Sequence, residues 1–392
     1  LRRGEQVTLT TEDVPGDAER IPVDYPHFPE MVSPGNTIYL ADGFLQLRVL
    51  EVAGTEVKTE VLIGGLLASR KGMNLVGELP QVEGMTERDL EGIRFGLSEG
   101  VDTFSISFVK RPEDMQKPRE FATLLGKPIR VIAKIERSEA LENLDGILRE
   151  ADGVMIARGD LGVQIPIQDV PSIQKRIIRM ANILGRPVIT ATQMLQSMTE
   201  NVRPTRAEVT DVANAILDGT DAVMLSEETS IGKFPVETVA MMASIARSAE
   251  EYRRSTLGPS NLEEYFRSSM GRKGIEVGDV VSLNVIEAMH ALNIRFILTP
   301  TNTGGTPRRV SRFKPDAWIL AFTRSESTEK FLVFSYGVYP FVIHPDREHW
   351  HDLIIQFARD AGFAERGDRV ILTEGVSPGV PGTDSLTIYR LD

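Results

Sequence analysis

Short apolar segments alternate with helical stretches between residues 103 and 225, and this rhythm limits the fold more than any other feature of the chain. A helix is expected at 171–184, where Pro171 suits the first turn and Gly185 the position after the last. Strands separated by helices form parallel sheets, so the region predicts an α/β fold of the barrel kind. The five predicted strands are 103–109, 129–135, 153–157, 187–191 and 222–225.

The segments on either side follow other patterns. Up to about residue 67, apolar and polar residues alternate in short runs such as 7–10 and 45–49, which predicts a small all-β module. Residues 251–274 are charged and only weakly periodic, and we expect them to form a connection. A second α/β pattern follows, with strands expected at 295–299, 317–321, 338–342 and 369–373.

Composition excludes several classes of protein. Of the 392 residues, 41% are hydrophobic and 26% are charged, as in globular rather than disordered chains. The net charge of -12 argues against a nucleic-acid partner, which would require an excess of basic residues. No apolar run approaches the roughly 20 residues of a membrane span. The absence of cysteine excludes disulfides and thiolate metal sites and fits a cytoplasmic protein.

The predicted strand 129–135 carries charged residues at its carboxyl end. Side chains alternate along a strand, so Lys134 and Glu136 share one face while the apolar Ala133 and Ile135 share the other. In a barrel the apolar face packs against helices, so Lys134 and Glu136 are expected to point into the mouth, where active sites lie. A structural ion pair at the rim is the competing interpretation.

Polar residues also follow the next three strands. Asp160 comes just after 153–157 and can meet Glu136, and two carboxylates at adjacent strand ends suit Mg²⁺. Thr192 and Ser226 add hydroxyls at the ends of the two strands that follow. Taken alone, the segment with Asp160 is better explained as a strand-to-helix turn, and Thr192 and Ser226 could each be a helix cap. Together they predict one polar basin, and a lysine beside a metal suits an anionic substrate with phosphate and carboxylate groups.

Several long motifs resemble those of the pyruvate kinase family, and they occur in the family's order. They are the segments 133–136, 155–162, 190–195, 203–208 and 211–215, together with 69–75, which looks like the hinge between the family's lid and barrel. The resemblance covers essentially the whole chain. It implies a (β/α)8 TIM-type barrel at 68–250 with an inserted small all-β lid at 1–67, followed by a C-terminal α/β regulatory domain at 251–392.

The resemblance also implies an activity, the transfer of the phosphoryl group of phosphoenolpyruvate to ADP, which gives ATP and pyruvate in the last step of glycolysis. Carried over to this sequence, Lys134 would stabilise the transferring phosphoryl group, and Glu136 and Asp160 would hold Mg²⁺ or Mn²⁺. Asp160 and the Gly159 amide would also lie near phosphoenolpyruvate, and Thr192 would contact substrate near the proton that reaches the enolate. Such a site works by positioning groups and neutralising charge.

Three further residues are implied to take part. Ser226 would belong to the relay of that proton, Lys71 would approach the nucleotide phosphates when the lid closes, and Asp42 would face the cleft from the lid. One position departs from the family pattern, because Glu227 stands where the family usually has glycine and adds a side chain and a charge. This departure bears on the geometry of the loop and leaves the class of reaction unchanged.

A glycine-rich loop after the predicted strand 295–299 suits a phosphate group. Hydroxyls, glycines and the N-terminus of a basic helix come together there. By resemblance it is the pocket for a phosphosugar or nucleotide effector, closed by the loop 373–383, and two surface loops with a solvated basic face are the alternative. The predicted effector-binding residues are Thr301, Thr303, Gly304, Thr306 and Arg308. The family resemblance further suggests a homotetramer.

One part of the family pattern is missing from the sequence. Family members carry three barrel strands before the lid, with a substrate-binding arginine, a nucleotide-binding arginine and the ligands of K⁺, and nothing in residues 1–67 matches them. We therefore expect an incomplete barrel, inactive as written, whose K⁺ ligands lie outside this chain. A truncated sequence and a real loss would both explain this, and the missing initial Met agrees with truncation.

Two other functions remain open on the sequence alone. A metal-dependent aldolase of the pyruvate-enolate type would use a similar pair of carboxylates on the same barrel, although it would not need the lid or the C-terminal domain. A non-catalytic remnant that binds effectors or partner subunits would fit the missing strands. Pyruvate release that depends on ADP distinguishes the first of these from a pyruvate kinase.

Overall fold

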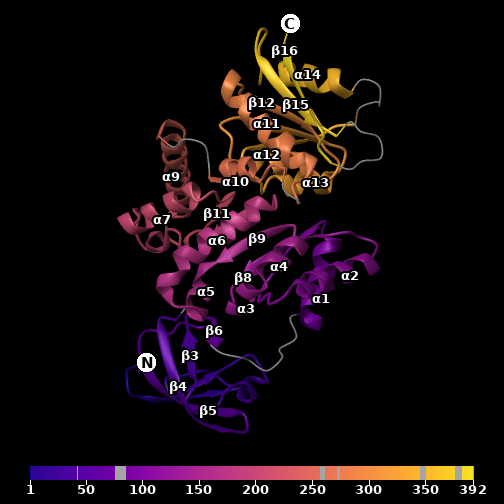
Figure 1. The fold of residues 1–392 in the computed structure, drawn as a ribbon. Helices are drawn as coiled ribbons and strands as arrows, with labels where there is room; N and C mark the ends of the chain where they lie inside the picture. Colours follow the sequence, from indigo (N-terminus) through magenta and orange to yellow (C-terminus); the bar gives the residue numbers. More distant parts are fainter. Residues whose placement is uncertain are drawn as a thin grey trace.

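The structure is a computed structural model, and it describes residues 1–41, 43–75, 85–256, 261–271, 274–344, 350–375 and 382–391. It consists of three units, each built on one sheet (Figure 1). The N-terminal all-β unit lies at one end of the molecule and the C-terminal α/β unit at the other, with the central parallel sheet between them.

The N-terminal unit is a six-stranded sheet in the order β2-β1-β5-β4-β3-β6. Its elements are β1 (Gln6–Thr10), β2 (Arg20–Pro22), the 3-10 helix η1 (Phe28–Met31), β3 (Thr37–Leu40), β4 (Leu45–Ala53), β5 (Glu56–Ile63) and β6 (Met73–Leu75). Leu45, Leu47 and Val49 of β4 are buried, which confirms the predicted period of two. Because β6 pairs with β3, the sheet extends to Leu75, beyond the boundary predicted at residue 67.

The central unit contains the parallel sheet that the strand–helix rhythm predicts. Its strands pair in chain order: β7 (Thr103–Ile106), β8 (Arg130–Ile135), β9 (Gly153–Ala157), β10 (Val188–Ala191) and β11 (Ala222–Met224). All neighbours are parallel, so the five carboxyl ends lie at one edge. β7 ends at Ile106 rather than at residue 109, because the chain turns at Phe108, whose φ is 57°.

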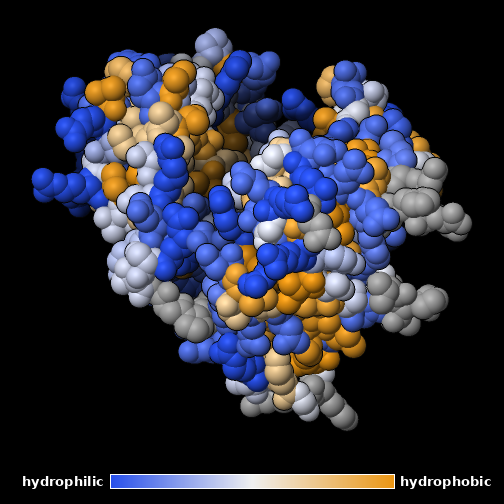
Figure 2. All heavy atoms as spheres, turned by 90° about the horizontal axis from the view of Figure 1, so that it is seen from above, coloured by the Kyte–Doolittle hydropathy of each residue, from blue (hydrophilic) through white to orange (hydrophobic). Residues whose placement is uncertain are grey.

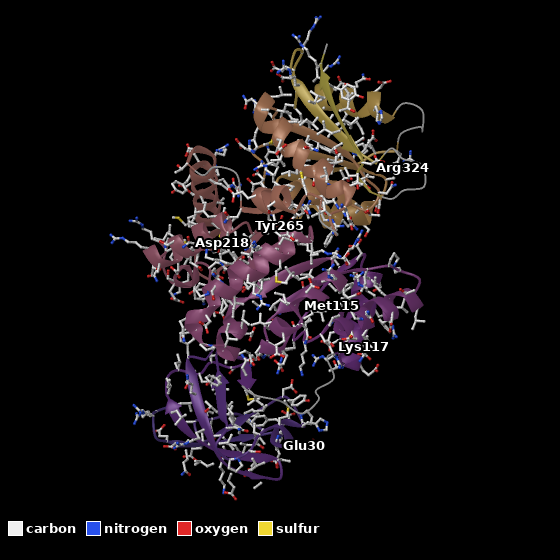
Figure 3. All side chains as sticks on the ribbon, in the orientation of Figure 1. Glu30, Met115, Lys117, Asp218, Tyr265 and Arg324 are labelled. Carbon is white, nitrogen blue, oxygen red and sulfur yellow. The ribbon has the colours of Figure 1, made fainter. Side chains whose placement is uncertain are left out.

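Helices connect these strands and cover the sheet. They are α1 (Glu87–Ser98), η2 (Pro112–Met115), α2 (Gln116–Leu124), α3 (Ser138–Glu142), α4 (Leu144–Glu150), α5 (Arg158–Gln164), η3 (Ile167–Asp169), α6 (Val170–Ile183), η4 (Gln196–Thr199), α7 (Arg206–Leu217), α8 (Glu227–Ser230) and α9 (Pro235–Thr256). Ala133 and Ile135 of β8 pack into the core that these helices share, as the alternation of side chains predicts. Met115, labelled in Figure 3, is fully buried in the same core.

The C-terminal unit has a five-stranded sheet in the order β14-β13-β12-β15-β16. Its elements are α10 (Asn261–Ser269), α11 (Val277–Leu292), β12 (Phe296–Pro300), α12 (Gly305–Ser311), β13 (Trp318–Thr323), α13 (Glu326–Leu332), β14 (Val338–Val342), α14 (Trp350–Asp360), β15 (Arg369–Glu374) and β16 (Ser385–Arg390). The first four strands agree with the sequence pattern. The antiparallel edge strand β16 was missed, because most of its residues are partly exposed and give no apolar run.

The prediction that residues 251–274 form a connection is wrong for most of this segment, which is helical. Helix α9 continues to Thr256, and α10 begins at Asn261. The reason is Phe266, which is 3% exposed and packs edge-on against Phe313 in the core of the C-terminal unit. Tyr265, labelled in Figure 3, lies where α10 meets the central unit.

A buried charged contact joins the central and C-terminal units. Lys314 Nζ lies 2.8 Å from Asp221 Oδ1, and the two side chains are only 5% and 4% exposed. Asp221 also accepts hydrogen bonds from the amides of Tyr336 and Val188. On the face seen in Figure 2, hydrophilic residues are interspersed with hydrophobic areas. Within the described ranges, no helix combines the length and apolar character needed to span a bilayer.

Candidate active site

The predicted pair of Lys134 and Glu136 lies at the carboxyl end of β8. Glu136 is 2% exposed, and its Oε1 is 2.6 Å from Lys134 Nζ. The other oxygen, Oε2, accepts a hydrogen bond of 2.8 Å from the amide of Phe108, and Lys134 also donates to Ser107 Oγ at 2.8 Å. A quarter of the Lys134 side chain is exposed to solvent, while its ammonium group is fixed by Glu136 and Ser107.

Ser107 and Phe108 were not found by sequence reasoning. Both follow β7, the strand beside β8, and the Phe108 amide reaches Glu136 only because Phe108 has a positive φ of 57°. A non-glycine residue with this backbone conformation gives no recognisable sequence signal. Ser107 falls inside the strand predicted at 103–109, and only the end of β7 at Ile106 in the structure places it beyond the strand.

Gly159 and Thr192 are brought together at the ends of β9 and β10. The Gly159 amide donates to Thr192 Oγ1 at 2.9 Å, and this hydroxyl donates to the carbonyl of Ala191 at 2.7 Å. Thr192 and Gln193 both have positive φ, 67° and 53°. Such conformations cost about 1–3 kcal/mol each and persist only where the surroundings hold them.

Arg158 supplies much of that support, although no sequence pattern indicated a role for its side chain. Its guanidinium donates to the carbonyls of Ala191 at 3.3 Å and Thr192 at 2.9 Å. A salt bridge of 2.7 Å to Asp211 on α7 fixes the guanidinium in turn. Arg158 therefore holds the backbone of the Thr192 segment in place. The conformation of the Arg158 side chain depends in turn on its contact with Asp211, which is distant in the sequence.

Asp160 contacts the N-terminal unit. Its Oδ1 accepts a hydrogen bond of 3.1 Å from Asn74 Nδ2 on β6, and Gln164 Nε2 on α5 donates to the carbonyl of Leu75 at 2.8 Å. These contacts hold β6 against the mouth of the central unit. Asp42, the other residue predicted on this unit, lies outside the described residues.

The donor set suits a hard cation bound jointly by protein and substrate. Within the described part of the chain, no cluster of three or more His, Asp or Glu side chains is arranged to hold a metal alone. Glu136 and Asp160 nevertheless offer carboxylate oxygens at adjacent strand ends. Mg²⁺ is usually held by one or two carboxylates, with waters and substrate phosphates completing its octahedron. The two residues fit that pattern.

The end of β11 carries Ser226 and two glutamates with different surroundings. Glu228 is fully buried and accepts hydrogen bonds from the amides of Ser226 at 2.7 Å and Leu195 at 3.1 Å, which joins the β10 and β11 loops. Glu227 forms an ion pair with Lys71. Hydrogen bonds from Lys71 and then from Gln196 lower the pKa of Glu227. The structure thus places Lys71 at the mouth of the central unit.

The predicted effector loop lies at the start of α12. Thr301 Oγ1 accepts a hydrogen bond of 2.9 Å from the amide of Gly304, whose φ of 79° precedes the helix, and Thr303 lies in the same turn. Thr306 Oγ1 is 2.6 Å from Thr383 Oγ1, so the loop after β15 meets this one, as predicted. Residues 376–381 of that loop lie outside the described residues.

Arg308 faces the central unit. Its guanidinium lies over the Phe331 ring, 5.7 Å from the centroid, and its Nε donates to the carbonyl of Gly304. Burial, followed by the nearby charges of Arg186 and Arg130, lowers the pKa of Arg308 to about 10. The side chain therefore belongs as much to the contact between the two units as to the loop.

Comparison with known proteins identifies the family. A model described as "Pyruvate kinase, barrel domain" matches residues 1–239, and one described as "Pyruvate kinase, alpha/beta domain" matches 279–389. The chain belongs to the pyruvate kinase family. A protein named "Pyruvate kinase" from Thermococcus litoralis is 50% identical over 392 residues, 100% of this chain and 82% of its own length. One from Thermotoga maritima is 39% identical over 100% of this chain and 82% of its length.

A solved structure agrees with the sequence relatives. A pyruvate kinase from Cryptosporidium parvum superposes with a TM-score of 0.84 and 34% identity, covering 100% of this chain and 79% of that one. The family confirms the predicted resemblance, the fold class and the phosphotransferase function. The division at residues 67 and 250 and the roles of individual residues stay predictions.

Proposed function

We propose that the basin at the carboxyl ends of β8 to β11 is where this protein transfers the phosphoryl group of phosphoenolpyruvate to ADP. The observation that supports this is the Lys134 ammonium, which is partly exposed yet fixed by Glu136 and Ser107. Phosphoryl transfer requires positioning and charge neutralisation more than covalent chemistry. A rigidly held cation at the mouth supplies both at the place where charge develops.

The second half of the reaction is assigned to Thr192 and Ser226. The Thr192 hydroxyl is held by the Gly159 amide and the Ala191 carbonyl, so its orientation is set before substrate arrives. We infer that Thr192 contacts the substrate beside the enolate carbon and that Ser226, at the next strand end, belongs to the relay of its proton. Lys71 and Asp42 are proposed to meet the nucleotide.

Glu136 and Asp160 are proposed to hold Mg²⁺ or Mn²⁺, which when bound supplies positive charge to the phosphoryl and enolate oxygens. Asn74 would orient Asp160 from the N-terminal unit, because it occupies one of the two carboxylate oxygens. K⁺ dependence and a homotetramer are proposed from the family resemblance alone. The phosphosugar or nucleotide effector is also supported by the glycine-rich loop before α12, and the cytoplasmic location by the absence of cysteine.

Removing either metal ligand is expected to weaken metal binding by about tenfold or more. Glu136→Gln and Asp160→Asn should each lower Mn²⁺ affinity, and the double variant should be little worse than the poorer single one, because ligands of one ion are not additive. Titration followed by electron paramagnetic resonance measures free Mn²⁺. Glu30→Gln, on the N-terminal unit, serves as control. Unchanged affinity in Glu136→Gln would show that Glu136 serves only its structural ion pair with Lys134, and unchanged affinity in Asp160→Asn would show that Asp160 serves only its contact with Asn74.

The activity itself is tested by a coupled assay for pyruvate. Release of pyruvate from phosphoenolpyruvate should require both ADP and a divalent cation. Cleavage or formation of a pyruvate aldol without ADP would contradict the proposal and favour the aldolase. Binding of phosphoenolpyruvate and Mn²⁺ without turnover would favour the non-catalytic alternative.

A further inference from the structure

Lys71 and Glu227 form a contact that the family pattern does not anticipate. They are 156 positions apart, Lys71 just before β6 of the N-terminal unit and Glu227 at the start of α8. The Lys71 ammonium pairs with Glu227 Oε1, and Gln196 Nε2 donates to the other oxygen at 2.9 Å. Both carboxylate oxygens are therefore occupied, and one of them neutralises Lys71.

Glu227 is not the buried carboxylate that binds the backbone amides of its loop. That role belongs to the neighbouring Glu228, which is fully buried and bonded to the amides of two loops. The side chains of Lys71 and Glu227 are instead 35% and 38% exposed. Ion pairs with this exposure are weak and are readily replaced by competing charges. The geometry is that of an exchangeable contact rather than a fixed one.

We propose that Glu227 is a counter-ion that Lys71 exchanges for the phosphates of a nucleoside diphosphate or triphosphate. Without nucleotide, the pair holds the segment before β6 against the mouth of the central unit. A polyphosphate carries several charges and displaces the single carboxylate, so Glu227 lowers nucleotide affinity and makes release easier. The proposal rests on the proposed function, in which Lys71 meets the nucleotide.

The test removes the charge of Glu227 and keeps its shape. In Glu227→Gln the affinity for Mg-ADP, measured by isothermal titration calorimetry, should increase about two- to fivefold, the range expected for an exposed ion pair. Adenosine, which carries no phosphate, should show no gain. On a Lys71→Met background the Gln substitution should have no effect on ADP, because its partner is gone. Glu200→Gln, which removes the exposed pair with Lys233, is the matched control and should change nothing.

Two results would overturn the exchange. One is an unchanged ADP affinity in Glu227→Gln, and the other is an equal gain with Lys71→Met in place. A readout without nucleotide is the rate at which an acylating reagent modifies Lys71, followed by mass spectrometry. Glu227→Gln should raise that rate several-fold, and an unchanged rate would show that the pair does not form. Failure of the unsubstituted chain to bind ADP would count against the proposed function, while the acylation rate would still report on the ion pair.

Discussion

Replacing Lys134 with methionine is expected to lower kcat for phosphoryl transfer about a thousandfold or more, with a smaller change in KM. The ammonium would meet charge that develops on the transferring phosphoryl group, and an interaction made mainly in the transition state affects kcat rather than ground-state binding. An arginine that stabilises the transition-state charge in GTPases is worth about 10³–10⁵ in kcat, which sets the scale expected for such a cation. Proton exchange into pyruvate should survive better, because it depends on the metal ligands and the Thr192–Ser226 end of the basin.

The measurement combines the coupled pyruvate assay with the incorporation of deuterium into pyruvate, followed by nuclear magnetic resonance. Lys175→Met, which removes an exposed cation from α6, is the matched control and should retain full activity. Thermal unfolding must accompany both, because Lys134→Met leaves the buried Glu136 with the Phe108 amide as its remaining partner among the described residues. Nearly unchanged phosphoryl transfer in a folded Lys134→Met would remove Lys134 from the reaction.

Much of the basin could be predicted because two simple rules apply to it. Parallel strands bring their carboxyl ends to one edge, and alternation puts Lys134 and Glu136 on the face opposite the helices. These rules use only local sequence and chain order. They place the residues on neighbouring strand ends without any knowledge of side-chain contacts.

The supporting residues could not be predicted in the same way. The Phe108 amide and the Thr192 hydroxyl are placed by positive φ values at non-glycine positions, and no sequence pattern predicts these values. Asn74 reaches Asp160 only because the N-terminal unit docks on the mouth, a contact between segments 86 positions apart. The sequence shows Glu227 as a charge in place of the family's glycine, but the ion pair of Glu227 with Lys71 is evident only in the tertiary structure. Long-range contacts thus set the geometry of groups whose identity was already evident.

The other large effect is expected at the buried pair between the central and C-terminal units. Lys314→Met should destabilise the protein by about 3 kcal/mol, the lower end of the range for breaking a buried ion pair. Methionine keeps the packing of the aliphatic chain, so the variant removes mainly charge. The loss follows because the buried Asp221 carboxylate, 4% exposed, would lose its ammonium partner, although the amides of Tyr336 and Val188 still donate to it.

Denaturant unfolding gives the free energy, and Arg254→Met provides the comparison. Arg254 and Asp316 also join α9 to the C-terminal unit, but their side chains are 51% and 56% exposed, so breaking that pair should leave the free energy of unfolding nearly unchanged. Both substitutions remove one cation from the interface between the central and C-terminal units. The two ion pairs differ in their burial, so burial explains a difference in the measured loss. A loss below 1 kcal/mol in Lys314→Met would mean that two backbone amides alone satisfy the buried Asp221 carboxylate.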